Sequence, residues 1–424
     1  MGGRLLRRWL NDPLLEVKDI QERLDAVKEL KDNMMLRGEI TDTLKKVYDI
    51  ERLAGKMTYG NANARDMITL KNSLERLPEV KSVLEMCQSH KLKELYENLD
   101  ELKDVFALIE KSIVEDPPMT IKDGGIIKLG YDEEIDTLKR ASTEGKTWLA
   151  KLEADEKEKT GIKTLKVGYN KVFGYYIEVS KSFVSQVPER FVRKQTLTTG
   201  ERYITEELKT IENQILGAEE KVINLEYNAF VEIRTEIAKN IKRLQKTANV
   251  VSTLDVLSSF AQVAEDMNYC MPVVKDDGII NIKEGRHPVI EKMIGSGNFV
   301  PNDTYLDKEG DRLAIITGPN MAGKSTYMRQ VALITLMAQV GSFVPATEAQ
   351  IGVVDKIFTR VGASDDLSMG QSTFMVEMME VATILKEATE NSLVILDEIG
   401  RGTSTYDGLS IAWAVAEYIA NKEK

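Results

Sequence analysis

The sequence has 424 residues, a formal net charge of −11 and hydrophobic side chains at 42% of its positions. This length predicts two or three domains, and the negative charge excludes a chain that is basic throughout, so any nucleic-acid surface has to be local. Two histidines and two well-separated cysteines argue against a zinc site, a serine–histidine triad and a disulfide framework. No apolar run reaches the length of a membrane helix and no secretory signal opens the chain, so we expect a cytoplasmic protein that does not contact a membrane.

Residues 1–115 carry apolar side chains at three- and four-residue spacings with charged residues between them, a pattern that predicts helices. The expected helices are Arg4–Leu10, Leu15–Leu36, Arg65–Leu77, which Pro78 ends, and Lys91–Ile113, which ends before Pro117 and Pro118. We therefore expect a helical first region.

Two later segments have the pattern of a long antiparallel helix pair. Apolar residues between Tyr131 and Leu152 follow a near-heptad line, and those between Leu208 and Leu244 step by three and four throughout. Because no proline lies between Pro188 and Pro272, the second segment can form one helix of about 40 residues, roughly 60 Å long. Such a rod is either a mechanical element that reaches something distant or a plain coiled coil.

The segment between these two arms is different, because Leu165–Tyr169 and Tyr175–Val179 alternate in the manner of a β-hairpin. Residues 163–202 hold eight Lys or Arg against three Glu, a local excess of positive charge in an acidic chain. We interpret this tip as a surface for the phosphate backbone of double-stranded DNA. The residues expected to contact DNA are Lys171, Arg193 and Lys194. The alternative is a solvated hairpin with incidental basic residues.

Beyond Asp276 the pattern becomes α/β, with short apolar runs alternating with amphipathic helices. The runs are Leu313–Thr317, Ile357–Val361 and Leu393–Leu396, and the helices are Tyr327–Val340, Phe374–Ala388 and Leu409–Ala420. Alternation of this kind predicts a mostly parallel sheet with crossover helices.

The pattern G-x-x-x-x-G-K-S follows the first of these runs and precedes a helix, which is the arrangement of a phosphate-binding loop. Gly318 and Gly323 permit backbone conformations in which successive N–H groups point at phosphate oxygens, and the next helix presents its N-terminus to the anion. Lys324 is expected on the β- and γ-phosphates and Ser325 on Mg²⁺. The predicted nucleotide-binding residues are Gly318, Pro319, Asn320, Met321, Ala322, Gly323, Lys324, Ser325 and Thr326. The alternative is a glycine-rich turn that matches by chance.

Two carboxylates, Asp397 and Glu398, follow the apolar run Leu393–Leu396. In a parallel sheet the C-terminal ends of the strands face the ligand crevice beside the phosphate loop. Asp397 is therefore predicted to hold Mg²⁺, directly or through water, and Glu398 to orient or deprotonate the attacking water.

A second polar turn, residues 368–374, precedes another amphipathic helix. Its residues fit a second anion site and an ordinary helix cap equally well, so both interpretations stay open.

Taken together, these segments resemble the MutS family of mismatch-repair ATPases in the ABC class. The matching stretches are Thr317–Gln330 (TGPNMAGKSTYMRQ), Ser372–Met378 (STFMVEM) and Leu396–Gly408 (LDEIGRGTSTYDG), with weaker matches at Glu284–Pro288, Val167–Tyr176, Arg4–Trp9 and Asp49–Arg52. The resemblance covers essentially the whole chain, and its ATPase motifs are highly specific.

By this resemblance the chain is a multidomain protein. It has helical core and lever segments at 1–144 and 212–266, a β-containing clamp that closes on DNA at 145–211, and an α/β P-loop ATPase domain at 267–424. The resemblance implies ATP with Mg²⁺ as cofactors and Phe299 stacked on adenine. It also implies a homodimer in which Ser372 of one subunit contacts the γ-phosphate held by the other. A MutL-type downstream partner and a bacterial cytoplasmic location at the nucleoid are implied as well.

The sequence departs from the family pattern at both ends. The domain that reads a mismatch through Phe-x-Glu and the connector domain are missing, and the chain stops at Lys424 before the family's switch histidine and its dimerisation helices. From the sequence we therefore expect a fragment with an incomplete ATPase domain and low turnover. Two alternatives to an ATP-driven DNA clamp of mismatch repair stay open. One is a MutS paralogue that acts in recombination, and the other is a non-catalytic module that binds DNA and nucleotide.

Overall fold

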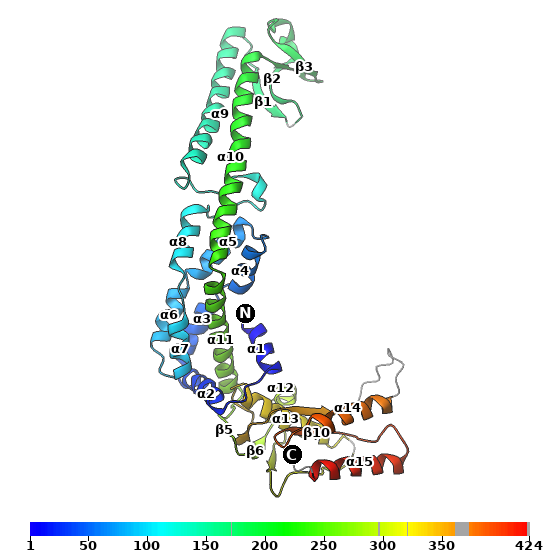
Figure 1. Cartoon of the computed structure of the whole chain (residues 1–424). Helices are drawn as coiled ribbons and strands as arrows, with labels where there is room; N and C mark the ends of the chain where they lie inside the picture. The colour runs from blue at the N-terminus through cyan, green and yellow to red at the C-terminus, as the bar shows by residue number, and fades with distance from the viewer. Residues whose placement is uncertain (171, 296, 320, 361–372, 422–424) are drawn as a thin grey trace. The chain divides into compact units, whose positions relative to one another are not determined.

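The computed structural model describes residues 1–170, 172–295, 297–319, 321–360 and 373–421, and its contacts divide the chain into two compact units. The first unit consists of residues 1–47, 76–101 and 246–424, and the second of residues 48–75 and 102–245. Each unit is thus assembled from segments that are distant in sequence, as the colours of Figure 1 show.

The helical part of the first unit draws on all three of its segments. Its helices are α1 Gly2–Asn11, α2 Val17–Asp32, α3 Met34–Leu44, α6 Leu77–Glu85, α7 His90–Asn98 and α11 Ile241–Asp266, of which the first few residues belong to the second unit. Leu24, Leu84 and Leu254 are fully buried, so the apolar stripes of early and late helices form the core. The guanidinium of Arg23 lies 3.5 Å from the ring centroid of Trp9 and joins α2 to α1.

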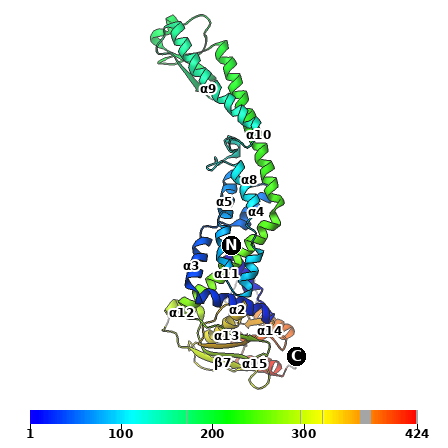
Figure 2. The same ribbon diagram turned by 90° about the vertical axis from the view of Figure 1, so that its left-hand side faces the viewer.

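The helices of the second unit are α4 Ile50–Thr58, α5 Ala64–Leu74, α8 Lys103–Ser112, the 3₁₀ turn η1 Ile121–Asp123, and the long helices α9 Glu133–Thr160 and α10 Glu206–Lys239. Helices α9 and α10 lie side by side in both views (Figures 1 and 2). The expected antiparallel pair is therefore present.

The expectation that the second helix of this pair runs unbroken to Leu244 is wrong. Asn240 leaves the helical conformation with ψ of 13°, its side-chain amide donates to the carbonyl oxygen of Glu236, and α11 begins after it.

Three further helix boundaries differ from expectation, each because of one residue. The expected helix at 15–36 is two helices, because the side chain of Asn33 accepts a backbone N–H of the first turn of α3. The expected helix at 91–113 is also two, since Leu102 adopts a left-handed φ of 53° before α8. Pro78 starts a helix rather than ending one, because it lies in the first turn of α6, where its missing N–H needs no partner.

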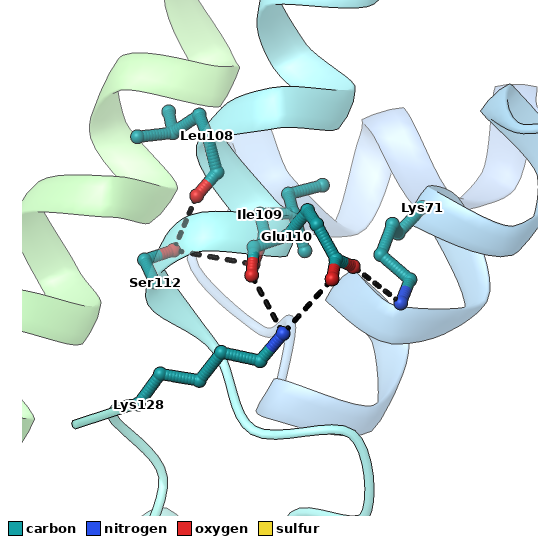
Figure 3. Close-up of polar contacts among 6 residues, drawn as sticks. All are labelled: Lys71, Leu108, Ile109, Glu110, Ser112 and Lys128. Atoms are coloured by element: carbon teal, nitrogen blue, oxygen red, sulfur yellow. Dashed lines mark hydrogen bonds and ion pairs between the residues drawn. The ribbon is translucent and has the colours of Figure 1, made fainter. Parts of the chain in front are cut away.

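A cluster of one carboxylate and two ammonium groups joins three segments of the second unit (Figure 3). Glu110 of α8 accepts a hydrogen bond from Lys71 of α5 at 2.7 Å and another from Lys128, in the loop before α9, at 3.0 Å. Hydrogen bonds and attraction from Lys71 and Lys128 lower the pKa of Glu110 from its ordinary value of 4.5.

Glu110→Gln should therefore lower the free energy of unfolding at pH 7 by about 0.5–1 kcal/mol, because the cluster is partly exposed. A carboxylate with a lowered folded pKa stabilises the protein above its unfolded pKa, and this contribution disappears as the pH falls through the folded value. The difference between wild type and variant should therefore shrink below pH 4.5. Urea unfolding between pH 3 and pH 7, with the exposed Glu115→Gln as control, measures it. A difference that does not change with pH would contradict the assignment.

A four-stranded antiparallel sheet connects α9 to α10. Its strands are β1 Lys166–Asn170, β2 Gly174–Ser180, β3 Val192–Thr196 and β4 Gly200–Ile204 in the order β1-β2-β4-β3, with the 3₁₀ turn η2 Lys181–Gln186 after β2. Ile177 and Val179 of β2 pack with Leu208 of α10 in one apolar cluster. The predicted hairpin at the tip of two long helices is confirmed, and β3 is an edge strand of its sheet.

The last part of the first unit mixes helices and strands. Its elements are β5 Val273–Lys275, β6 Ile280–Gly285, α12 Pro288–Ile294, β7 Asn302–Leu306, α13 Lys324–Gln339, β8 Glu348–Gly352, β9 Ile357–Arg360, α14 Thr373–Glu387, β10 Leu393–Leu396 and α15 Thr405–Ala420. Strands β9 and β10 are parallel, as predicted, with Arg360 opposite Leu396. Helix α13 packs against β10, and α14 against β9.

Two expectations about this region are wrong. The run Leu313–Thr317 is not a strand, because among the described residues no neighbouring strand pairs with its backbone, and an apolar run alone cannot complete a ladder. The larger sheet, ordered β5-β8-β6-β7, is not mostly parallel: β6 runs antiparallel to both of its neighbours. Across the described ranges, no helix is both long and apolar enough to span a bilayer.

Candidate functional site

The loop Gly318–Thr326 changes from irregular backbone to helix at Gly323. Gly323 is the N-cap of α13 with φ of 90°, and Met321 has φ of 66° with a fully exposed side chain. Both residues are in the left-handed region, which favours glycine and strains methionine. The first N–H groups of α13 have no acceptor within the helix, so the loop presents them and the positive end of the helix dipole at one place.

Lys324 is the first residue of α13, and its side chain turns back into the loop. Its Nζ donates to the carbonyl oxygen of Gly318 at 2.7 Å and to that of Pro319 at 2.8 Å. Ser325 and Thr326 follow in the first helical turn and are half-buried. Asn320 lies outside the described residues. The structure thus places Lys324 and Ser325 in the first turn of α13, with the Lys324 ammonium against the carbonyl oxygens of the loop.

The two predicted carboxylates follow β10. Asp397 is 8% exposed, and its backbone N–H donates to the carbonyl oxygen of Arg360 at 2.8 Å. Glu398 has φ of 55°, and its carboxylate pairs with Arg401 at 2.5 Å. The packing of α13 on β10 brings the two elements together, but within the described part of the chain Asp397 makes no ion pair with Lys324. The structure therefore shows the elements as neighbours and leaves these side chains apart.

The other predicted nucleotide contacts are placed less completely. Phe299 is half-buried in the segment before β7. Ser372 and the polar turn at 368–372 lie outside the described residues, and α14 begins immediately after them at Thr373.

Three basic residues in and beside the four-stranded sheet fall into two classes. Arg190 makes two hydrogen bonds of 2.7 and 2.6 Å to the fully buried carboxylate of Glu156, so it is a structural residue. Arg193 and Lys194 lie on the edge strand β3 and are exposed. The side chain of Arg193 is 64% exposed and meets Glu201 only at 3.5 Å, and Lys171 lies outside the described residues. The sequence count therefore overstates the positive charge that is free to meet a ligand.

Comparison with known proteins adds an independent observation. Residues 314–424 match MutS domain V, and residues 1–261 match MutS domain III. The second match alone spans more than half of the chain. The chain belongs to the MutS family. Similar relatives are called DNA mismatch repair protein MutS: the one from Ruminiclostridium cellulolyticum is 63% identical over 424 residues, and the one from Acetivibrio thermocellus is 60% identical over 422 residues. These alignments cover 100% of this chain but 49% and 48% of the two relatives, so this MutS-family chain spans about half the length of the curated relatives it matches.

Sequence reasoning on this MutS-family chain missed two buried residues beside the carboxylates, Arg360 and Glu377. Glu377 accepts the backbone N–H of Gly400 at 2.5 Å, and its other oxygen lies 4.0 Å from the Arg360 guanidinium. Glu377 lies inside one of the matching stretches. The sequence feature that could have identified it is a glutamate on the apolar side of a predicted helix.

Proposed function

We propose that this chain acts in DNA mismatch repair, binding ATP with Mg²⁺ at the Gly318–Thr326 loop and the backbone of double-stranded DNA at the four-stranded sheet. The single observation that carries the nucleotide part is the turn at Gly323, which opens the N-terminus of α13 with Lys324 inside the loop. A triphosphate needs converging N–H donors and a positive charge, and the N-terminus of α13 with Lys324 beside it supports this assignment. The names of the relatives support the repair role.

The residues present fit a bound nucleotide with its metal. Backbone N–H groups of the loop would hold the phosphates, and Lys324 would replace its carbonyl partners by β- and γ-phosphate oxygens. Ser325 and Asp397 would hold Mg²⁺, which neutralises charge that develops on the phosphates. Glu398 would exchange its partner Arg401 for the attacking water.

Three parts of the proposal rest on the family resemblance. Phe299 would stack on adenine. Ser372 would reach the nucleotide of a second subunit in a homodimer, and a MutL-type protein would act downstream.

The DNA part rests on the exposed basic edge of the sheet. Arg193 and Lys194 project from β3: Arg193 meets Glu201 at 3.5 Å, and Lys194 makes no ion pair among the described residues. Arg190 and Arg202 are instead held by Glu156 and Glu178 at 2.6 and 3.0 Å. Exposed basic side chains on a sheet edge bind phosphates whatever the base sequence. We therefore expect binding that depends on salt and little on sequence.

Replacing Arg193 and Lys194 together by Ala should weaken binding to all duplexes alike. If both contact phosphates, the slope of log K against log salt should fall by roughly two, at about 0.9 for each contact. Fluorescence anisotropy at several salt concentrations measures the slope. The matched control replaces the exposed Lys18 and Lys45 by Ala, which removes the same charge from the first unit. A slope that falls equally in both pairs would place the DNA surface elsewhere.

A further inference from the structure

The turn that carries Asp397 and Glu398 is held from a different element, the helix α14. Glu377 of α14 is 3% exposed, and its Oε1 accepts the backbone N–H of Gly400 at 2.5 Å. A hydrogen bond from a backbone N–H to a buried carboxylate is among the stronger ones in proteins. Gly402 adds a second contact, because a Cβ built on it would lie 3.2 Å from the Cβ of Phe374, three residues before Glu377 on α14.

The same helix also holds the strand beside this turn. Arg360, at the end of β9, is 5% exposed, and its Nε lies 2.9 Å from a carboxylate oxygen of Glu380, one helical turn after Glu377. Its Nη2 lies 4.0 Å from Glu377 itself. The backbone of Arg360 in turn accepts the N–H of Asp397 at 2.8 Å. Helix α14 therefore contacts the segment of Asp397 and Glu398 in two ways. It contacts Arg360 of β9, which bonds to Asp397, and it contacts Gly400 directly.

The backbone of residues 398–400 is itself conformationally restricted. Glu398 has a left-handed φ of 55°, which costs a non-glycine residue free energy unless its surroundings impose it. Gly400 has φ of 80°, and a Cβ on it would lie 2.6 Å from the backbone of Gly408. Gly400, two residues after Glu398, is therefore held between the backbone of Gly408 on one side and the carboxylate of Glu377 on the other.

We propose that Glu377 is a positioning residue, which through Gly400 and Arg360 fixes where Asp397 and Glu398 point. The proposal rests on the proposed function, since it assigns to Glu377 the task of orienting the carboxylates toward the metal and the attacking water. Glu377 touches neither the loop Gly318–Thr326 nor the phosphates in this scheme. Its loss should therefore lower turnover and leave the affinity for ATP without Mg²⁺ unchanged, because misplacing a reacting group lowers the rate of the chemical step while the phosphates are held by the loop.

The test compares Glu377→Gln with Glu387→Gln. Gln keeps the shape of Glu377 and an acceptor oxygen but removes the charge that strengthens the bond to Gly400. Glu387 lies at the end of the same helix, its side chain is 51% exposed, and it pairs with Lys356 at 3.4 Å, away from the contacts that join α14 to Arg360 and Gly400, so its substitution is the matched control. Hydrogen exchange of the backbone amides of residues 397–402, measured without nucleotide, shows directly how strongly the bond between Gly400 and Glu377 protects this turn. ATP affinity, measured without Mg²⁺ because Asp397 is a proposed metal ligand, and kcat, measured with Mg²⁺, are then determined on the same proteins.

Glu377→Gln should raise exchange at 397–402 by roughly five- to tenfold, leave ATP affinity within about twofold, and lower kcat by about tenfold or more. Glu387→Gln should leave exchange at the turn unchanged. Unchanged exchange in Glu377→Gln, equal effects of both variants, or a loss of affinity with unchanged kcat would each overturn the proposal. A wild-type protein that binds no ATP would instead overturn the proposed function, and the exchange arm would still decide whether Glu377 holds the turn.

Discussion

Lys324→Ala should lower the affinity for ATP by about ten- to a hundredfold, as expected for the loss of hydrogen bonds from a charged donor. The Lys324 ammonium lies within the loop, where its hydrogen bonds are to the carbonyl oxygens of Gly318 and Pro319. Removing it takes away the only side-chain cation that the loop Gly318–Thr326 contains. Thermal unfolding should change little, because Lys324 is not part of an apolar core. Isothermal titration calorimetry with ATP and Mg²⁺ measures the affinity.

Two companion variants make this experiment specific. Lys292→Ala removes an exposed charge from α12 in the same unit and should bind ATP like wild type. Glu398→Gln alters the carboxylate that pairs with Arg401, and it should keep ATP affinity while slowing hydrolysis, because its proposed partner is the water rather than a phosphate. Equal ATP affinity of wild type and Lys324→Ala would remove the nucleotide assignment from the loop.

Glu226→Ala should lower the free energy of unfolding by about 3–5 kcal/mol, the cost of breaking a buried ion pair by removing one partner. Glu226 lies on α10 in the second unit and is fully buried. Its carboxylate accepts the backbone N–H groups of Gly125, Ile126 and Ile127 at 2.5, 3.4 and 3.3 Å and pairs with Lys139 of α9 at 2.6 Å. The variant would leave these groups without their acceptor inside the protein.

The matched control is Glu220→Ala, an exposed glutamate on the same helix, which should change stability by less than about 0.5 kcal/mol. Urea unfolding followed by circular dichroism compares the two variants. Hydrogen exchange at residues 124–127 should rise most in Glu226→Ala, since that loop loses its acceptor. If both variants unfolded at the same urea concentration as wild type, the carboxylate would not be holding the loop.

Local patterns predicted the elements that depend on neighbours in sequence. The three- and four-residue spacing of apolar side chains found α10 and the helical character of α9, and alternation around Asn170 found the hairpin of β1 and β2. The parallel pairing of β9 with β10 followed from the alternation of strands and helices. Each of these depends on a period that the residues themselves carry.

What the sequence could not predict depends on distant partners or single caps. Leu313–Thr317 has the composition of a strand, but a strand needs a neighbour to pair with, and composition does not supply one. Asn33 and Asn240 interrupt helical patterns through side-chain hydrogen bonds that periodicity does not register. Counting charges could not separate Arg190, which the buried Glu156 holds, from the exposed Arg193.

The candidate site divides in the same way. The spacing of glycines before Lys324 predicted that a helix follows this segment, and α13 begins at Lys324, three residues before the expected Tyr327. The neighbours of Asp397 were not predictable, since Arg360 and Glu377 come from β9 and α14 and meet the turn only in the folded chain.

The measurement that tests the central proposal most directly is hydrogen exchange of the wild-type chain with and without ATP and Mg²⁺. A nucleotide held as proposed covers the backbone N–H groups of the loop and orders the carboxylate turn. Exchange should therefore slow most in residues 318–328, with a smaller slowing in residues 397–402, and it should stay unchanged in helices α2 and α3. Omitting Mg²⁺ should abolish the slowing at residues 397–402 while part of the slowing at residues 318–328 remains. Exchange that is unaffected at 318–328, or slowed only in other segments, would contradict the proposal that this loop binds ATP.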